Sequence, residues 1–245
     1  MASEARSPSP GAMDYFPAYS NALWEAYKAN AYSQNGEDGL MAELLARLGI
    51  REGWVVEAGA WDGIHLSNTF ALLRRGGFRA LYVEGDAAKY ADLMDTTRRL
   101  PPGTIVPVNC LLRSDEDTLG EVMRRHGLPA EPVVLSLDID SWDYDVWANL
   151  DPAFKPAVVV IEIESGVHPL EWKIHGRDGW QHPTSFLPML MLGAEKGYKL
   201  VAHSGNMVFV RADLWARLGV PDVNPLSCFR SSWLVAQVQE RRKKL

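Results

Sequence analysis

Apolar positions along the chain follow two kinds of pattern. Nearly continuous apolar runs, such as Val133–Leu137 and Val158–Ile161, suit strands that are buried on both faces of a parallel sheet. Between such runs, apolar residues recur at helical spacing, as in Asp38–Leu48. Strands that alternate with helices in this way predict an α/β fold built on a doubly wound, mostly parallel sheet.

The pattern also gives approximate bounds for the elements. Strands are expected over Trp54–Glu57, Ala80–Glu84, Thr104–Asn109, Pro132–Asp138 and Ala157–Glu162. Helices are expected over Asn21–Ala31, Asp38–Leu48, Asn68–Arg75, Ala87–Leu100, Asp117–His126, Tyr144–Leu150 and Trp233–Leu245. Near the C-terminus, two strand-like runs flank a short turn and predict an antiparallel hairpin, namely Lys199–His203 and Met207–Arg211.

Length and composition indicate one globular unit with a tail. The chain has 245 residues, of which 47% are hydrophobic and 23% charged, as is usual for globular proteins. Met1–Met13 is rich in Ser, Pro and Ala without periodicity, so we expect a disordered tail. Residues 14–245 are expected to form a single domain, with a helical extension over 14–50.

Charge, hydropathy and cysteine content exclude several classes of protein. The net charge of −6 argues against a nucleic-acid partner. No apolar run approaches the ~20 residues that span a bilayer, so no membrane partner is expected. The first residues lack the apolar stretch of a secretory signal, and we therefore expect a cytoplasmic protein. Only two cysteines are present, Cys110 and Cys228, which excludes a disulfide scaffold and an all-cysteine metal site.

The strongest chemical signal is the segment Val55–Gly63, VVEAGAWDG, at the end of an expected strand. Ligands of open α/β sheets bind at the carboxyl ends of strands. Gly59 and Gly63 let the backbone approach a ligand closely or adopt unusual dihedral angles. Trp61 stands where a dinucleotide fingerprint has its middle glycine, and no phosphate-binding lysine follows. The segment therefore predicts a ligand without a pyrophosphate.

Polar side chains also end the following strands. Glu84 ends the second strand of the alternation, where an acidic residue can accept both ribose hydroxyls of an adenosine ligand. Asn109 and Asp138 end the third and fourth strands. Since the carboxyl ends of parallel strands meet at one edge of a sheet, Glu57, Glu84, Asn109 and Asp138 are expected to gather in one functional cluster.

These segments together resemble a known family. They are YSQNGED at 32–38, VVEAGAWDG, SNT at 67–69, YVEGD at 82–86, SLDIDSWDYDVW at 136–147, VVVIEIE at 158–164 and GYKLVAHSGNMVFVRADL at 197–214. Over roughly residues 32–214 the chain resembles class I S-adenosylmethionine-dependent methyltransferases, most of all the FkbM-type group. The resemblance implies a Rossmann-like methyltransferase fold of seven strands that ends in the antiparallel hairpin.

The resemblance also implies roles for individual residues. Residues expected to bind S-adenosylmethionine are Gln34, Glu57, Gly59, Gly63, Ser67, Asn68, Glu84, Asn109 and Asp138. Glu84 corresponds to the ribose-binding acid, and Asn109 stands where a contact to the adenine edge is expected. Asp138 and Asp140 occupy positions that face the reacting methyl group. Trp61 departs from the small residue usual at that position of the loop.

The expected reaction is transfer of the methyl group to a small or glycosylated metabolite, at a hydroxyl oxygen. A hydroxyl is a poor nucleophile at neutral pH, so a base or a cation must assist its deprotonation. One interpretation is a magnesium site formed by Asp138 or Asp140 with Glu162 or Glu164, for which we select Asp138, Asp140 and Glu164. Another is a histidine base in the long irregular stretch 166–185, for which we select His168 as a third catalytic residue beside Asp138 and Asp140.

Three other functions compete with this reading. N-methylation of an amine or amino-acid-like acceptor needs only a neutral amine and no strong base. A cofactor-binding scaffold without catalysis would have lost the carboxylates at the strand ends, yet here they are present. An NAD-dependent oxidoreductase is disfavoured by the missing middle glycine.

Overall fold

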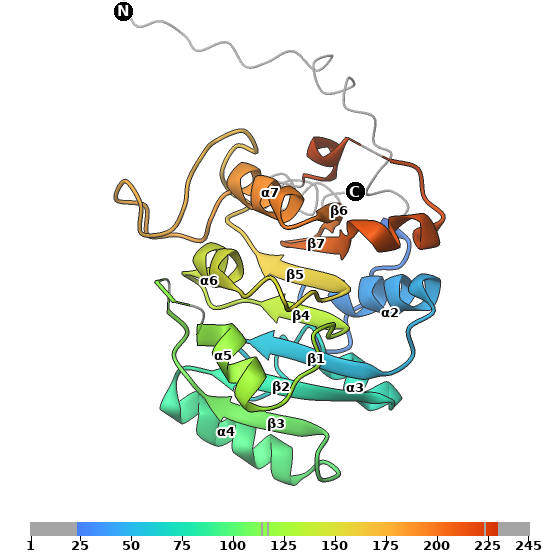
Figure 1. The fold of residues 1–245 in the computed structure, drawn as a ribbon, viewed down its shortest axis with the longest axis vertical. Helices are drawn as coiled ribbons and strands as arrows, with labels where there is room; N and C mark the ends of the chain where they lie inside the picture. Colours follow the sequence, from blue (N-terminus) through green and yellow to red (C-terminus); the bar gives the residue numbers. More distant parts are fainter. Residues whose placement is uncertain (1–23, 114, 117, 223, 230–245) are drawn as a thin grey trace, which may run out of the picture.

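The computed structural model describes residues 24–113, 115–116, 118–222 and 224–229. Within these ranges the chain forms one seven-stranded sheet (Figure 1). The strands are β1 (Gly53–Ala58), β2 (Phe78–Glu84), β3 (Ile105–Asn109), β4 (Val134–Leu137), β5 (Val158–Glu162), β6 (Tyr198–His203) and β7 (Asn206–Arg211). Their order is β3-β2-β1-β4-β5-β7-β6, and β7 runs antiparallel to both neighbours while β1 to β5 pair in parallel. The predicted fold class, a doubly wound and mostly parallel sheet with a C-terminal antiparallel hairpin, is confirmed.

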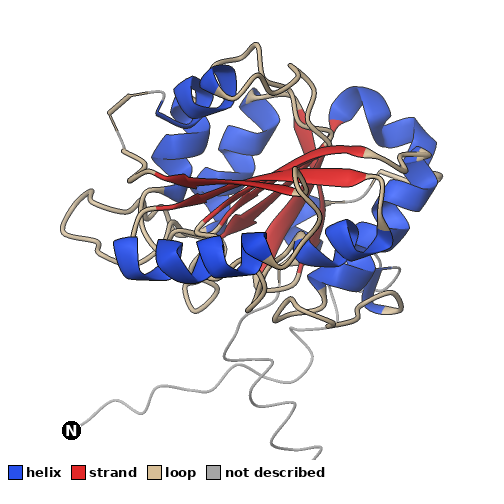
Figure 2. Ribbon diagram, turned by 90° about the horizontal axis from the view of Figure 1, so that it is seen from below, coloured by secondary structure: helices blue, strands red, loops and turns tan. Residues whose placement is uncertain are grey.

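Helices cover both faces of the sheet (Figure 2). One face packs against α2 (Glu37–Leu48), α3 (Phe70–Arg75), α4 (Ala87–Arg98) and the 3-10 helix η2 (Ala212–Leu218). The other face packs against α5 (Thr118–Arg125), α6 (Asp143–Asn149) and α7 (Phe186–Glu195). A further 3-10 helix, η3 (Pro225–Cys228), contacts β6. The two helical layers explain why the strands are apolar at successive positions.

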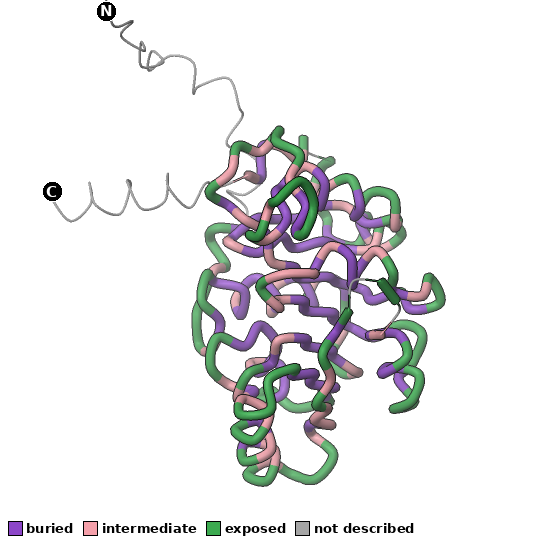
Figure 3. Tube along the Cα trace, turned by 90° about the vertical axis from the view of Figure 1, so that its left-hand side faces the viewer, coloured by how far each residue is buried: buried purple, intermediate pink, exposed green. Residues whose placement is uncertain are grey.

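Alternation along each strand divides the core into two halves. In β1, Val55 belongs to the cluster on the α2 side and Val56 to the cluster on the α6 side. Val158 and Val159 divide in the same way in β5, and all four valines are fully buried. Buried residues follow the strands through the middle of the molecule, whereas exposed residues follow the outer loops and helices (Figure 3). Burial on both faces is the state that the apolar runs predicted.

The predicted helix over Asn21–Ala31 is wrong in its second half. In the described part of this segment, helix is present only at Trp24 and Glu25. Asp38 Oδ2 accepts hydrogen bonds from the backbone N–H groups of residues 31, 32 and 33, at 2.7, 2.7 and 2.9 Å. A side chain that captures these donors competes with helix formation. The expected tail Met1–Met13 and the expected helix Trp233–Leu245 lie outside the described residues.

Strand order fixes where a ligand can bind. The chain runs outward from β1 through β2 to β3, and then returns to the other side of β1 as β4 and β5. The point between β1 and β4, where the direction reverses, is the place at which open α/β sheets bind ligands outside the carboxyl ends of their strands. No helix within the described ranges is long and apolar enough to cross a membrane.

Candidate functional site

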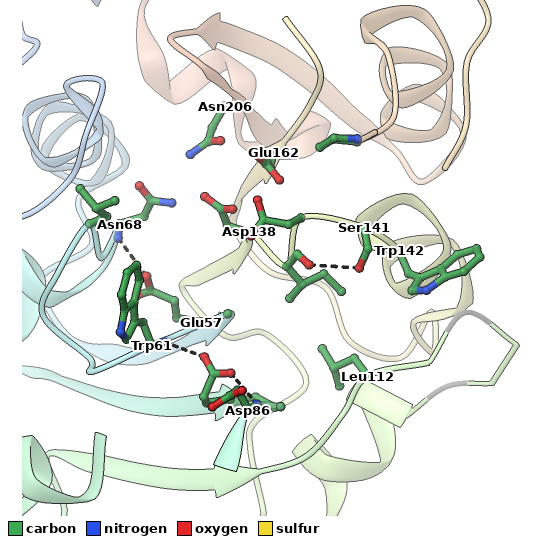
Figure 4. Close-up of a pocket in the computed structure, with 18 of the residues that line it drawn as sticks. Glu57, Trp61, Asn68, Asp86, Leu112, Asp138, Ser141, Trp142, Glu162 and Asn206 are labelled. Atoms are coloured by element: carbon green, nitrogen blue, oxygen red, sulfur yellow. Dashed lines mark hydrogen bonds between the residues drawn. The ribbon is translucent and has the colours of Figure 1, made fainter. Parts of the chain in front are cut away.

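A cavity of about 1020 Å³ lies at this reversal point (Figure 4). The ends of β1, β2, β4 and β5 contribute Glu57, Glu84, Asp138 and Glu162 to its lining. Other residues that line it are Gln34, Asn35, Gly59, Trp61, Leu66, Asn68, Asp86, Lys89, Asp140, Glu164, Gly205 and Asn206. The volume is at the upper end of what ligand pockets usually offer, about 1,000 Å³.

Gly59 carries the backbone across the end of β4. Its φ is +81°, and a Cβ at this position would lie 1.8 Å from the carbonyl oxygen of Asp138. Both the dihedral angle and the contact require glycine. The loop after β1 therefore passes directly against the end of β4, so that Gly59 and the Asp138 side chain line the same cavity.

The carboxylate of Glu57 is occupied by the chain itself. Ser67 Oγ and Thr69 Oγ1 donate to its Oε2, and the backbone N–H of Asn68 donates to Oε1 at 3.0 Å. Asn68 Nδ2 in turn donates to Ser136 Oγ on β4. Glu57 is buried, and burial raises its pKa. Its main effect on the site is thus to hold Asn68 at the cavity wall.

Glu84 keeps acceptor capacity free for a ligand. Its Oε2 accepts from the backbone N–H of Trp61 at 2.8 Å, and its Oε1 accepts from the backbone N–H of Asp86 at 2.7 Å. A carboxylate offers about four acceptor positions, so two backbone donors leave about two unused. Asp86 caps α4 by accepting from Ala88 and Lys89. The arrangement holds Glu84 rigidly and still lets it accept two hydroxyl groups.

Three carboxylates converge between β4 and β5. Asp138, Asp140 and Glu162 each place one oxygen within 4.8 Å of the other two. Burial first, and then the charge of the neighbouring aspartates, raises the pKa of Asp138 to about 7 and that of Glu162 to about 9. Asp143 is buried and accepts from the backbone N–H groups of residues 139 and 141, which holds the turn that carries Asp140. At neutral pH the cluster therefore retains protons that isolated carboxyl groups would lose.

We expect this cluster to make folding stability fall as the pH rises. The unfolded chain releases its carboxyl protons near pH 4, whereas the folded chain keeps those of Asp138 and Glu162 to about pH 7 and 9. Between these limits the folded state binds more protons, so a rise in pH favours unfolding. In buffer containing EDTA, the two groups together cost about 6 kcal/mol between pH 5.5 and 8.5, so the thermal midpoint should drop by about 12 °C.

Two variants test the origin of that slope. Glu162→Gln replaces a carboxyl group that the folded chain must keep protonated by a neutral amide of similar shape, so it should raise the midpoint at pH 8.5 and flatten the pH dependence. Glu121→Gln changes an exposed carboxylate on α5 and serves as the control, with the slope of the unchanged chain. A Glu162→Gln protein with an unchanged slope would show that the cluster is not the source.

The same cluster meets the requirements of a divalent cation. Its donors are all carboxylate oxygens, the ligands that Mg²⁺ prefers. Glu162 Oε2 is buried and has no hydrogen-bond partner, so an uncompensated acceptor is present at the site. The residue of β5 that belongs to this carboxylate cluster is Glu162, whereas the sequence led us to select Glu164 as the metal ligand. Glu164 lines the cavity, but its Oε1 accepts from the backbone N–H of Gly166 at 2.7 Å, and it lies outside the cluster.

Four of the selected residues lie outside the cavity lining. Gly63 packs on the core, where a Cβ would lie 2.7 Å from Leu93 Cδ1. Ser67 is buried against Glu57. Asn109 is turned back to donate to the carbonyl of Glu84, and His168 is exposed, with its Nδ1 accepting from the N–H of residue 170. Gln34, Glu57, Gly59, Asn68, Glu84, Asp138 and Asp140 do line the cavity.

Some lining residues were not expected from the sequence. Asn35 and Asn206 reach the cavity from opposite ends of the chain. Fully buried Glu37 joins them: Asn35 donates its backbone N–H to Oε2 at 2.7 Å, while Ser204 Oγ and Asn206 Nδ2 donate to Oε1 at 3.3 and 3.5 Å. The turn Ser204-Gly205-Asn206 was visible as a hairpin signal, but nothing in it indicated a ligand.

Comparison with known proteins gives structural matches of low similarity. No protein-family model and no curated protein matches the chain. Solved structures that match include a SAM dependent methyltransferase from Aquifex aeolicus, with 12% identity over 69% of this chain and 87% of that chain and a TM-score of 0.42. The CMeT domain of the citrinin polyketide synthase matches with 13% identity over 83% of this chain and 57% of that chain, at a TM-score of 0.48.

The glycopeptide N-methyltransferase MtfA, in complex with S-adenosyl-L-methionine, is a third match. Its identity is 15% over 74% of this chain and 95% of that chain, with a TM-score of 0.42. At such values these similarities do not establish a family for this chain. The functional proposal therefore rests on the strand order and on the residues that line the cavity.

Proposed function

We propose that the protein is an S-adenosylmethionine-dependent methyltransferase that methylates a hydroxyl oxygen of a small or glycosylated metabolite. The observation that carries the proposal is the meeting of Glu84, Gly59 and Asp138 in one cavity of about 1020 Å³ at the reversal point of the sheet. The cavity is large enough for a nucleoside and an acceptor together. FkbM-type kinship stays a prediction, because no family model matches the chain.

The two ends of the cavity suit the two substrates. At the β2 end, Glu84 has acceptor positions free for the ribose hydroxyls of the cofactor. At the β4 and β5 end, Asp138 and Glu162 face the region left for the methyl group and the acceptor. The sulfonium makes the methyl group electrophilic, so the protein needs only to align the reacting atoms and accept a proton.

Asp138 is suited to accept that proton. Burial and neighbouring carboxylates raise its pKa to about 7, which is where a general base works best at neutral pH. In the proposed step, the acceptor oxygen forms a bond to the methyl carbon as the carbon–sulfur bond breaks. The hydroxyl proton passes to Asp138, and S-adenosylhomocysteine leaves. Glu162, with a pKa of about 9, stays protonated and can donate a hydrogen bond.

A cation-assisted form of the same reaction is a second candidate. Asp138, Asp140 and Glu162 would hold Mg²⁺, which the unpartnered Oε2 of Glu162 favours. The ion would supply positive charge that lowers the pKa of the acceptor hydroxyl.

N-methylation is less well matched to the carboxylate cluster. The negative charges of Asp138 and Asp140 would attract an ammonium group into the cavity. The same charges would favour the protonated form, which has no lone pair to attack the methyl carbon. A hydroxyl acceptor gains from a nearby base, whereas an amine acceptor must first lose a proton against this field.

Calorimetric titration of the full chain tests the proposal. S-adenosylhomocysteine should bind with one site per chain, and NAD should not bind. Binding of NAD alone would end the methyltransferase proposal. Transfer of a labelled methyl group to a library of hydroxylated and glycosylated metabolites would then identify the acceptor. Running the assay with EDTA, and again with added Mg²⁺, separates the two candidates: activity that persists in EDTA excludes the cation-assisted form.

A further inference from the structure

Three residues of the cavity wall have a backbone conformation that L-residues seldom adopt. Among the described residues, the non-glycine residues with positive φ are Trp61, Leu66, Asp140 and Asp178, and the first three line the cavity. Their φ angles are 46°, 58° and 59°. A bulky side chain in this region is a genuine outlier, and such residues persist only where something else requires them.

Packing in the fold does not account for Trp61. Its side chain is 40% exposed, although indole is among the largest apolar groups that folding can bury. Its ring contacts are with two side chains near the surface: Lys89 Nζ lies 4.7 Å from the ring centroid, and His65 lies edge-on at 5.1 Å. Exposed contacts of this kind stabilise a fold little. The strained backbone thus presents an apolar surface from which the core gains almost nothing.

The backbone of Trp61 is tied to the end of the cavity where a nucleoside would lie. Its N–H donates to Glu84 Oε2, the carboxylate with free acceptor positions for ribose. Figure 4 shows the indole standing in the cavity between Asn68 and Asp86. The hydrogen bond fixes the point from which the side chain projects, so the indole cannot move far from Glu84.

We propose that Trp61 caps the adenosine half of the bound cofactor, with its indole packed on the nucleoside that Glu84 holds. The proposal rests on the proposed function and adds a specificity-determining residue to it. An aromatic face stacks on a purine and excludes water from it. The positive φ is then the conformation that lets one residue donate its N–H to Glu84 and present its ring to the same ligand.

Calorimetry on three Trp61 variants tests this assignment with two ligands. S-adenosylhomocysteine has both halves of the cofactor, whereas 5′-methylthioadenosine lacks the amino-acid half. Trp61→Ala and Trp61→Gly should bind both ligands about tenfold more weakly, as expected for loss of one stacking contact. Trp61→Phe should stay within about threefold of the unchanged chain, because phenylalanine keeps an aromatic face.

Thermal unfolding separates this role from a structural one. Glycine adopts a positive φ without strain, so Trp61→Gly should unfold at the same temperature as the unchanged chain, or higher, while its affinity falls. Trp172→Ala is the control, since Trp172 is 53% exposed and lies outside the cavity lining. It should leave both affinities unchanged.

Two results would overturn the proposal. One is that Trp61→Ala and Trp61→Gly bind S-adenosylhomocysteine as the unchanged chain does. The other is that they lose affinity for S-adenosylhomocysteine but keep it for 5′-methylthioadenosine, which would place the indole at the amino-acid half. Neither can be confused with failure of the proposed function, in which the unchanged chain itself binds no S-adenosylhomocysteine.

Discussion

Replacing Gly59 with alanine is expected to abolish measurable binding of S-adenosylhomocysteine and to lower the free energy of unfolding by about 3 kcal/mol. The methyl group would lie 1.8 Å from the carbonyl oxygen of Asp138, so the backbone on one side must move. The φ of +81° adds a conformational cost for any L-residue. Movement would separate the loop after β1 from the end of β4, and it would displace Trp61, whose N–H donates to Glu84. Calorimetry and denaturant unfolding measure the two effects.

Gly76 provides a matched control for that substitution. Its φ is +80°, almost the same as at Gly59, but a Cβ there would have no atom within 4 Å. Gly76→Ala therefore carries a backbone cost alone, about 1–3 kcal/mol at its ψ of 164°, and should leave cofactor affinity unchanged. If Gly59→Ala behaves like Gly76→Ala in both measurements, the close approach to Asp138 does not define the site.

Asp138→Asn should reduce kcat by about 10²- to 10⁴-fold, the range expected when a general base is removed. Asparagine has nearly the same shape but cannot accept the proton. For the unchanged enzyme in EDTA, log kcat should rise with pH and level off above about 7, because only the ionised carboxylate is active. That rise should be absent from the variant. Binding of S-adenosylhomocysteine should stay within a few-fold, since Glu84 and Gly59 are untouched.

Asp92→Asn, at an exposed position on α4, is the control for this variant and should retain the full rate and its pH dependence. The assignment of Asp138 as the base would be contradicted if Asp138→Asn kept its activity. It would also be contradicted if the variant kept the same rise with pH, because another group would then be titrating.

Much of the fold could be predicted because a strand that is buried on both faces must be apolar at nearly every position. Val133–Leu137 and Val158–Ile161 are too continuously apolar for a strand with one wet face, and both lie in the centre of the sheet. The hairpin at Ser204-Gly205-Asn206 was equally visible through its turn chemistry. The segment before Asp38 was misassigned because its helical spacing was real, but the Asp38 carboxylate captures the backbone donors.

The candidate site could be predicted only where a strand end fixes the direction of a side chain. Glu57 is the second-last residue of β1, Glu84 is the last of β2, and Asp138 directly follows β4; all three line the cavity. Glu162 is the last residue of β5 and pairs with Asn206, whereas Glu164 lies beyond the strand and turns toward the backbone of residue 166. Spacing alone could not separate these two, because Glu162 follows Asp138, and Glu164 follows Asp140, by the same 24 positions.

For residues in loops, the sequence does not predict which way a side chain points. His168 lies in the irregular stretch 166–185, where no periodicity indicates which side chains face inward, and it is exposed. Asn109 ends β3 as expected, but its amide donates to the carbonyl of Glu84, and the residues after it form the wall instead. Whether a polar side chain faces a ligand or bonds to its own backbone depends on local geometry that one sequence does not carry.

The Glu37 contact has a consequence for biosynthesis. Because Glu37 bonds to Ser204 and Asn206, the wall of the cavity is complete only when β7 has been made. A nascent chain that ends before Asn206 lacks one side of the binding site, although β1 to β5 are already available to fold. A ligand that depends on this wall would therefore stabilise the polypeptide only after Asn206 has been added.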